Sequence, residues 1–398
     1  MKAKFLIVLI IILCSCGRKG NNQLRETDER IKVIDLLSKP DSRMVNLSDI
    51  ALDVQYLPLE TSDKSMIKNI SKVKIIENFI YLQNNVIEVM CFDRQGGFHY
   101  KLDKTGRGPE EYEYLGDFDI SSDGNTLAVM SGHKILEFRN TSGVFAFLRS
   151  INLSEPSPCY FCFVPGSNNI LLTICPWLGT EQALNILINS EGDTLCQKSN
   201  CYKYQKSDGI RSISTWDALQ YSFGNEARFK DVYSDTVFSV SNASNRFIPR
   251  IIFDSHGTVV NTKARSDPEY GKNHSNDFSQ IAYMSEVDRY VFYYCRVKGV
   301  TQKIIYDKVE NKKFDIDQGK KLRDNVCGGP DFDLGFNSAT EGKFYSFVEA
   351  LALKKHVNSA AFESAEVKDP KRKMALKKLA DSFKETDNPV MVIVTPKE

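Results

Sequence analysis

The chain has 398 residues, of which 42% are hydrophobic and 11% aromatic, and its 52 basic residues nearly balance its 51 acidic residues. This hydrophobic content suits a packed core and excludes an intrinsically disordered chain. The net charge of +1 gives no overall basic excess, so composition argues against a nucleic-acid partner.

The N-terminus has the pattern of a lipoprotein signal peptide, predicted here as residues 1–16. Lys2 and Lys4 precede an unbroken apolar run, residues 5–13, which is shorter than the roughly 20 residues that a membrane-spanning helix needs. The following Leu-Cys-Ser-Cys-Gly sequence resembles the site read by lipoprotein signal peptidase. We therefore predict that cleavage makes Cys16 the first residue and that its acyl chains anchor the protein in the membrane. The alternative is an ordinary secretory signal.

Residues 17–44 are predicted to form a flexible tether, because their first part is strongly polar. No acidic run follows Cys16, which favours an outer-membrane protein facing the periplasm over one on the cell surface. Residues 45–398 are predicted to form the folded domain.

A repeated hairpin runs through this domain. Each repeat has a short apolar strand, a turn rich in Gly, Asn, Asp or Ser, and a return strand. The five repeats are residues 91–98, 138–145, 187–195, 238–247 and 305–314. A period of about 40–50 residues with four strands per unit is typical of β-propeller blades. Each hairpin is therefore predicted to be the outer strand pair of one blade.

Inner strand pairs are predicted ahead of four of these hairpins. They are residues 73–76 with 79–82, 117–120 with 126–130, 161–164 with 170–174, and 279–283 with 290–294.

A sixth blade is split between the two ends of the domain. Residues 343–348 and 389–394 begin it, and residues 54–59 complete it. Joining the first and last segments in one blade closes the ring and protects strand edges. The sequence thus predicts an all-β fold, a six-bladed β-propeller.

Several stretches are similar to the six-bladed propeller lipoproteins of Gram-negative anaerobes, which are related in architecture to NHL-type propellers. They are residues 92–98 with 104–112, 234–240, 328–332 and 387–393. The resemblance extends over residues 45–398 and implies a fold and an envelope location. Most members of that family have no known function, so it implies no activity.

One helix is predicted inside the last blade, at residues 369–384. Asp369 suits the N-cap and Pro370 the first helical position. Its apolar side chains share one face, and Lys and Arg side chains make the other face basic. The apolar positions are Leu376, Leu379 and Phe383. We interpret it as a short basic amphipathic helix packed on the propeller rim, with contact to an anionic membrane or partner as the alternative.

Two loops are candidate binding sites. Residues 106–112 and 328–333 are each interpreted as a turn between blades, and loops at one mouth of a propeller are also where ligands bind. The functional hypothesis is that both loops line a ligand-binding mouth. Its residues are Arg107, Glu111, Tyr112 and Asp331.

Metal and nucleophile motifs are absent from the sequence. The five histidines have no metal-ligand spacing, and no GxSxG or EF-hand pattern occurs. Cys159 and Cys162 lie three apart in a strand-like run, where side chains point to opposite faces, so a redox or zinc pair is not expected. Bridges between Cys162 and Cys175, or between Cys196 and Cys201, stay open.

Two classes of function remain. The first is a non-catalytic binding or scaffold propeller that binds a glycan, a peptide or an envelope protein and has no cofactor. The alternative is a lactonase- or lyase-like hydrolase with a divalent cation such as calcium in the channel, which needs convergent Glu, Asp and Asn side chains.

Overall fold

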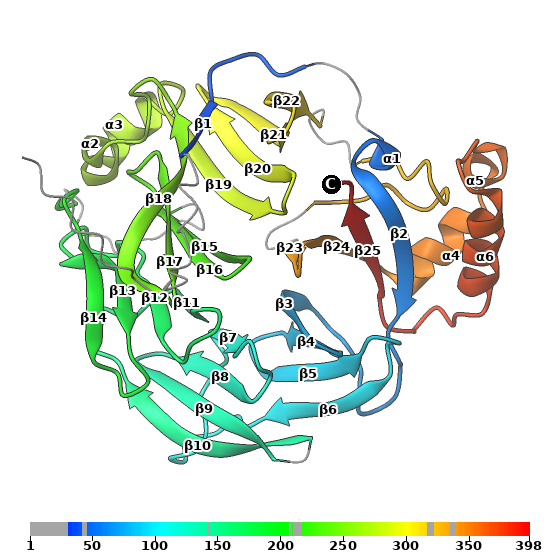
Figure 1. The fold of residues 1–398 in the computed structure, drawn as a ribbon, viewed down its shortest axis with the longest axis horizontal. Coiled ribbons are helices and arrows are strands. Elements are labelled where there is room, and N and C mark those ends of the chain that lie inside the picture. The colour runs from blue at the N-terminus through cyan, green and yellow to red at the C-terminus, as the bar shows by residue number, and fades with distance from the viewer. Residues whose placement is uncertain are drawn as a thin grey trace, which may run out of the picture. The chain divides into compact units, whose positions relative to one another are not determined.

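The computed structural model describes residues 31–41, 46–141, 143–206, 209, 217–316, 322–334 and 339–398. In these parts of the chain the strands form six sheets, which are arranged in a ring as the blades of a propeller (Figure 1). The predicted all-β, six-bladed β-propeller is therefore confirmed. The predicted signal peptide, with Cys16, lies outside the described residues.

Blades 1 to 5 each use four consecutive strands, and the first strand of each is the innermost (Figure 1). Blade 1 has β3 (Ile70–Ile76), β4 (Phe79–Asn84), β5 (Glu88–Asp93) and β6 (Phe98–Asp103). Blade 2 has β7 (Asp117–Ile120), β8 (Thr126–Ser131), β9 (Lys134–Thr141) and β10 (Val144–Asn152). Blade 3 has β11 (Tyr160–Phe163), β12 (Ile170–Thr173), β13 (Ala183–Ile188) and β14 (Thr194–Ser199). Blade 4 has β15 (Ala218–Phe223), β16 (Glu226–Asp231), β17 (Thr236–Ser241) and β18 (Ser244–Asp254). Blade 5 has β19 (Ser279–Glu286), β20 (Tyr290–Val297), β21 (Val300–Asp307) and β22 (Lys312–Asp315).

Blade 6 joins the two ends of the domain, as predicted. From the inside outwards it contains β23 (Ala339–Thr340), β24 (Lys343–Val348), β25 (Val390–Pro396) and β2 (Ala51–Pro58). β2 pairs antiparallel with β25, and Val54 lies opposite Val394 in the register. The outer strand of the last blade is thus an early segment of the chain, which closes the ring.

The predicted tether is wrong over part of its length. Within residues 17–44, β1 (Lys32–Asp35) pairs in parallel with β18 and adds a fifth strand to blade 4. Ile34 and Leu36 are buried against blades 4 and 5, so their apolar side chains hold this segment on the propeller.

The core lies between neighbouring blades. Successive side chains of a strand point to opposite faces of its sheet, so alternate residues enter two different interfaces. On β4, Ile80 and Leu82 pack in the core between blades 6 and 1, whereas Tyr81 packs between blades 1 and 2. Because both faces are covered, second strands such as β8 and β12 are largely continuous apolar runs.

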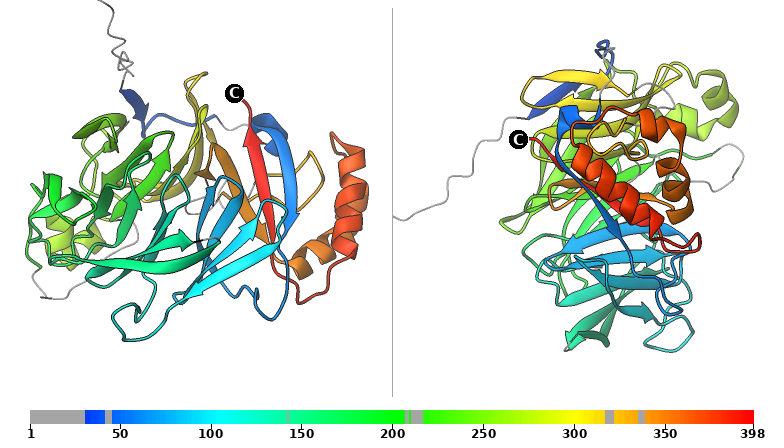
Figure 2. Two further views of the ribbon diagram at one scale, coloured as in Figure 1. Left: turned by 60° about the horizontal axis from the view of Figure 1, so that its bottom comes forward. Right: turned by 90° about the vertical axis from the view of Figure 1, so that its right-hand side faces the viewer.

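Six short helices occur in the described parts of the chain, and none is long and apolar enough to cross a membrane. They are α1 (Leu47–Ile50), α2 (Thr262–Ser266), α3 (Pro268–Asn273), α4 (Ala350–Val357), α5 (Ala360–Ser364) and α6 (Pro370–Asp381). The last three lie between β24 and β25 along the chain and outside blade 6 (Figures 1 and 2).

The predicted helix in the last blade is confirmed as α6. The Asp369 carboxylate caps it by accepting the backbone N–H groups of Lys371 and Arg372. Leu376 is buried in the core shared with blades 5 and 6. Lys373 on the basic face donates to backbone carbonyls at the end of α5. These contacts favour packing on the propeller rim.

Candidate functional site

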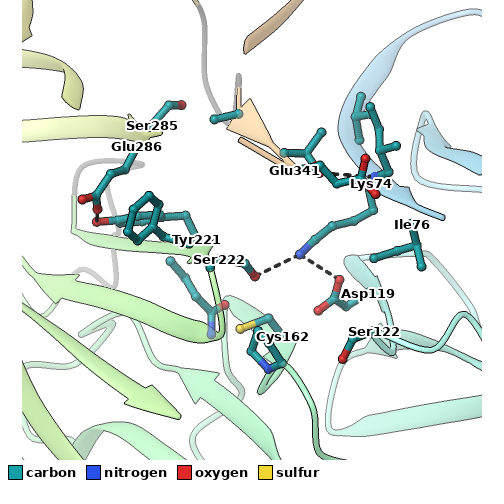
Figure 3. A pocket seen from close by; sticks show the side chains of 18 of the residues that line it. Lys74, Ile76, Asp119, Ser122, Cys162, Tyr221, Ser222, Ser285, Glu286 and Glu341 are labelled. Atoms are coloured by element: carbon teal, nitrogen blue, oxygen red, sulfur yellow. Dashed lines mark hydrogen bonds and ion pairs between the residues drawn. The ribbon is translucent and has the colours of Figure 1, made fainter. Parts of the chain in front are cut away.

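A cavity of about 400 Å³ lies on the axis of the ring, and all six blades contribute to its wall (Figure 3). Its lining follows the inner strands β3, β7, β11, β15, β19 and β23 and continues past their last residues into the turns that follow. The cavity therefore opens where the inner strands end. We call it the channel pocket.

Alternating charged residues on two neighbouring inner strands build one wall of the channel pocket. Lys72 on β3 lies 2.7 Å from Asp117 on β7, and Lys74 lies 3.0 Å from Asp119 two residues further along both strands. Figure 3 shows the Lys74 ammonium between Asp119 and Ser222, whose hydroxyl is 3.3 Å away. The spacing of two places Lys72 and Lys74 on one face of β3, and Asp117 and Asp119 on one face of β7.

The same carboxylates reach the next blade. Asp117 accepts the backbone N–H of Phe161 at 3.0 Å, and Asp119 accepts that of Phe163 at 2.9 Å. Phe161 and Phe163 lie on β11, whose channel-side edge has no strand partner. The two aspartates thus satisfy backbone donors that the sheet leaves unpaired.

Burial and ion pairing shift the pKa values of the charged groups in this wall in opposite directions. Burial alone would lower the pKa of Lys74, but the nearby Asp119 carboxylate outweighs it and the pKa is raised. Burial raises the pKa of Asp117, and Lys72 only partly offsets this. Lys74 therefore stays charged at neutral pH, held by the carboxylate beside it.

A buried hydrogen-bond network forms the wall of blades 4 and 5. The Tyr221 hydroxyl donates to Glu286 at 2.9 Å, and Glu286 also pairs with Arg228 at 2.5 Å and with Lys308 at 3.1 Å. Burial and the Glu286 carboxylate raise the pKa of Tyr221 well above its usual value. The guanidinium of Arg228 lies 4.4 Å from the centre of the Phe223 ring, which lines the channel pocket.

Positive and negative side chains balance around the channel pocket. Five basic and five acidic described residues line it or contact a lining residue: Lys72, Lys74, Arg94, Arg228, Lys308, Asp117, Asp119, Glu286, Asp288 and Glu341. Ion pairs join Lys72 to Asp117, Lys74 to Asp119, Arg94 to Glu341, and both Arg228 and Lys308 to Glu286. Most charges of the wall are therefore neutralised by ion pairs, with two bases, Lys72 and Lys74, and four acids, Asp119, Glu286, Asp288 and Glu341, in the lining itself.

The predicted loop residues lie elsewhere. The Tyr112 side chain is fully buried, and its hydroxyl donates to the carbonyl of Ile87 at 2.7 Å. The Glu111 carboxylate accepts the backbone N–H of Gly108 at 2.8 Å, within its own turn. Arg107 is highly exposed, with Glu113 at 3.6 Å. This geometry supports the interpretation of residues 106–112 as a structural turn.

Asp331 is exposed in the loop between β22 and β23. That loop is organised by Asp324, which accepts the Tyr56 hydroxyl at 2.8 Å and the backbone N–H groups of Val326 and Cys327 at 2.9 Å. Asp331 is not part of the channel pocket lining.

Strand direction explains why the two predicted loops miss the pocket. Each loop links the outer strand of one blade to the inner strand of the next. The four antiparallel strands of a blade bring the chain back to the end where inner strands begin. The structure thus brings the two loops to one end of the ring and places the channel pocket toward the other.

Sequence reasoning missed the channel residues, although a local signal was present. Lys-x-Lys at residues 72–74 and Asp-x-Asp at residues 117–119 alternate with apolar residues at strand spacing. Among the residues that the structure describes, no group of three or more His, Cys, Asp or Glu side chains is placed to hold a metal ion.

Fold and pocket together define the chain as a six-bladed β-propeller with a ligand-sized cavity on its axis. A family model described as a domain of unknown function, DUF4934, matches residues 31–395, so the chain belongs to this family. A search of curated proteins finds no match.

The chain is similar to two solved structures from Bacteroides, and the first of them shares the fold. A Bacteroides fragilis protein described as exported is 18% identical, with a TM-score of 0.65 over 93% of this chain and 100% of that one. A member of the DUF4221 family from Bacteroides vulgatus is 11% identical, with a TM-score of 0.46 over 87% of this chain and 97% of that one.

Proposed function

We propose that this protein is a non-catalytic binding module of the cell envelope, anchored through an acylated Cys16, and that its channel pocket binds a neutral, hydroxyl-rich group such as a sugar residue of a glycan. The observation that carries the proposal is the pairing of opposite charges around the pocket wall, where Lys74 meets Asp119 and Arg228 meets Glu286.

Paired charges favour a neutral ligand for an electrostatic reason. An ion entering the channel pocket would leave water and find its counter-charges already engaged, and burying a charge without a partner is costly. A hydroxyl group can both donate and accept, so it can bridge a lysine and a carboxylate without displacing either.

Size and surface also fit a sugar. A cavity of about 400 Å³ lies within the usual range for small-ligand sites, roughly 300–1,000 Å³. Phe163, Pro165 and Phe223 provide apolar lining beside the charged groups. This mixture suits a sugar ring, which has C–H surfaces and hydroxyl edges.

The test is a binding measurement of the full-length protein against neutral oligosaccharides, acidic oligosaccharides and peptides by calorimetry. We expect a neutral oligosaccharide to bind, and Ser222→Ala and Phe223→Leu to weaken it about tenfold or more, which is about 1.4 kcal/mol. Ser71→Ala is the matched control, since Ser71 lies by the start of the same channel and outside the pocket.

Two outcomes would overturn the proposal. One is binding of acidic oligosaccharides or peptides with no neutral ligand. The other is a neutral ligand whose affinity is unchanged by both pocket variants, which would place its site outside the channel pocket.

A further inference from the structure

Two cysteine side chains meet in blade 3, away from the channel pocket. Cys159 immediately precedes β11, and Cys175 follows β12 closely. The two strands pair antiparallel, with Tyr160 opposite Thr173, and the Cys159 N–H donates to the Thr173 carbonyl at 2.8 Å. Neither cysteine is in a disulfide, and a hydrogen bond between the two side chains shifts the pKa of both thiols.

Three hydrogen-bond donors lower the pKa of Cys159. They are the thiol and the backbone N–H of Cys175 and the side chain of Trp177. The Cys175 thiol contributes most to a lowered pKa of Cys159, against the opposing effects of burial and of Asp217. A thiolate at Cys159 is thus stabilised before any reagent arrives.

The other cysteines with a shifted pKa differ from Cys159. Burial is the largest cause that raises the pKa to about 12 in Cys91, Cys162, Cys295 and Cys327. Cys175 is buried and its pKa is raised, first by its hydrogen bond to Cys159 and then by burial. Cys159 itself is partly exposed. One thiol is therefore accessible and activated, and its neighbour is shielded.

We propose that Cys159 is a nucleophilic thiol that reacts with disulfides of small molecules or proteins, and that Cys175 then resolves the adduct to a Cys159–Cys175 disulfide. This site is independent of ligand binding in the channel pocket.

The electron balance of the reaction is complete. The Cys159 thiolate attacks one sulfur of the external disulfide, forms a mixed disulfide and releases the other half as a thiolate. That thiolate takes the Cys175 proton, and the Cys175 sulfur attacks Cys159 and expels the second half as a thiolate, which takes up from solvent the proton that Cys159 released when it ionised. Two protein thiols lose two electrons, and one external disulfide gains them.

The contact between Cys159 and Cys175 also distinguishes between the disulfides that these cysteines could form. Cys162, three residues after Cys159, lies in the core between blades 3 and 4 and lines the channel pocket. Cys175 contacts Cys159, so the Cys162–Cys175 bridge considered from the sequence is not the pair that the structure brings together.

The experiment exposes reduced full-length protein to oxidised glutathione, blocks the remaining thiols with N-ethylmaleimide and maps peptides by mass spectrometry without reduction. We expect a cross-link between the peptides of Cys159 and Cys175. Cys175→Ser should stop at a glutathione adduct on Cys159, and Cys159→Ser should leave Cys175 unmodified. The exposed Cys201 is the internal reference, and Cys159 should react more than tenfold faster.

The proposal is overturned if Cys159 reacts no faster than Cys201, if Cys175→Ser collects no adduct on Cys159, or if the wild-type protein stops at the mixed disulfide. Because Cys175 is buried, the melting temperature of each variant is measured first. Cys175→Ala replaces Cys175→Ser if the serine hydroxyl unfolds the site.

Discussion

The Lys74 ammonium lies 3.0 Å from the Asp119 carboxylate, across the boundary between blades 1 and 2. Asp119 also accepts the backbone N–H of Phe163 in blade 3, so one carboxylate connects three successive blades. Side-chain exposure is 17% for Lys74 and 2% for Asp119. Because both side chains are largely buried, we expect the pair to contribute to the stability of the propeller as well as to the shape of the channel pocket.

Removing one partner of this pair is expected to destabilise the propeller strongly. Lys74→Met leaves the Asp119 charge buried without its partner, and such losses are about 3 kcal/mol or more in unfolding free energy. Adding Asp119→Asn removes the stranded charge, so the double variant should recover part of the loss. Urea unfolding of the wild-type protein, the two single variants and the double variant measures the coupling energy between Lys74 and Asp119. Strictly additive changes in unfolding free energy would contradict an interaction between the two side chains.

Glu226 is expected to make the stability of blade 4 depend on acid. Hydrogen bonds and charges from Arg250 and Arg228 outweigh burial and hold the pKa of Glu226 below its usual value of 4.5. A lowered carboxyl pKa contributes stability that is present above the unfolded-state value and is lost as the pH falls through the folded-state value.

Glu226→Gln should therefore lower the unfolding free energy by about 2 kcal/mol at pH 7. The difference from the wild-type protein should shrink as the pH falls below 4.5. Urea unfolding at several pH values measures it, with the exposed Glu385→Gln as the control. A difference that stays constant down to acid pH would show that Glu226 acts by packing and not by charge.

Closure of the ring should depend on its last strand. In β25, Val394 lies opposite Val54 of β2 and opposite Phe344 of β24. Deleting residues 388–398 removes the strand between these two, so we expect loss of cooperative unfolding of the whole propeller in thermal denaturation.

A deletion at the other end provides the comparison. Removing residues 1–36 takes away β1, which only adds to the outer edge of blade 4. It should lower the melting temperature and leave a single cooperative transition. Equal damage from both deletions would argue against a special role for closure at blade 6.

The blades were predictable where turns and apolar runs coincide, and the inner pair of blade 4 shows why one pair was missed. β15 carries Gln220 and Ser222 toward the channel, and β16 carries Arg228 and Lys230 into buried positions. Polar residues buried by pairing break the apolar pattern that identifies a strand.

The channel pocket was not predictable for a different reason. Its wall combines residues from six strands far apart in the sequence, and only the closed ring brings them together. The loop of residues 106–112 attracted attention through its unusual composition, but that composition serves the turn itself, since Glu111 and Tyr112 bond to nearby backbone.

The membrane anchor is tested at Cys16. Cys16→Ala should prevent acylation and release the protein from the membrane fraction, because acyl chains and not a spanning helix would hold it there. Fractionation and mass spectrometry of the mature N-terminus measure the outcome. Cys14→Ala is the matched control and should change neither. An unmodified N-terminus in the wild-type protein would refute the anchor.

Two tyrosines in one loop separate a structural role from a binding role. The Tyr112 hydroxyl accepts the Lys104 N–H at 3.2 Å and donates to the Ile87 carbonyl at 2.7 Å, whereas Tyr114 is 47% exposed. Tyr112→Phe leaves these buried backbone groups without their partner, so we expect a loss of about 2 kcal/mol in unfolding free energy. Tyr114→Phe should change stability little.

Neither variant should alter affinity for a ligand of the channel pocket, since neither residue lines it. Urea unfolding and calorimetric titration of both variants measure the two effects separately. If Tyr112→Phe weakens binding while stability is unchanged, the loop of residues 106–112 takes part in recognition, as its composition first indicated. A loss of stability with full affinity would assign the Tyr112 hydroxyl to holding blades 1 and 2 together at the point where the chain crosses between them.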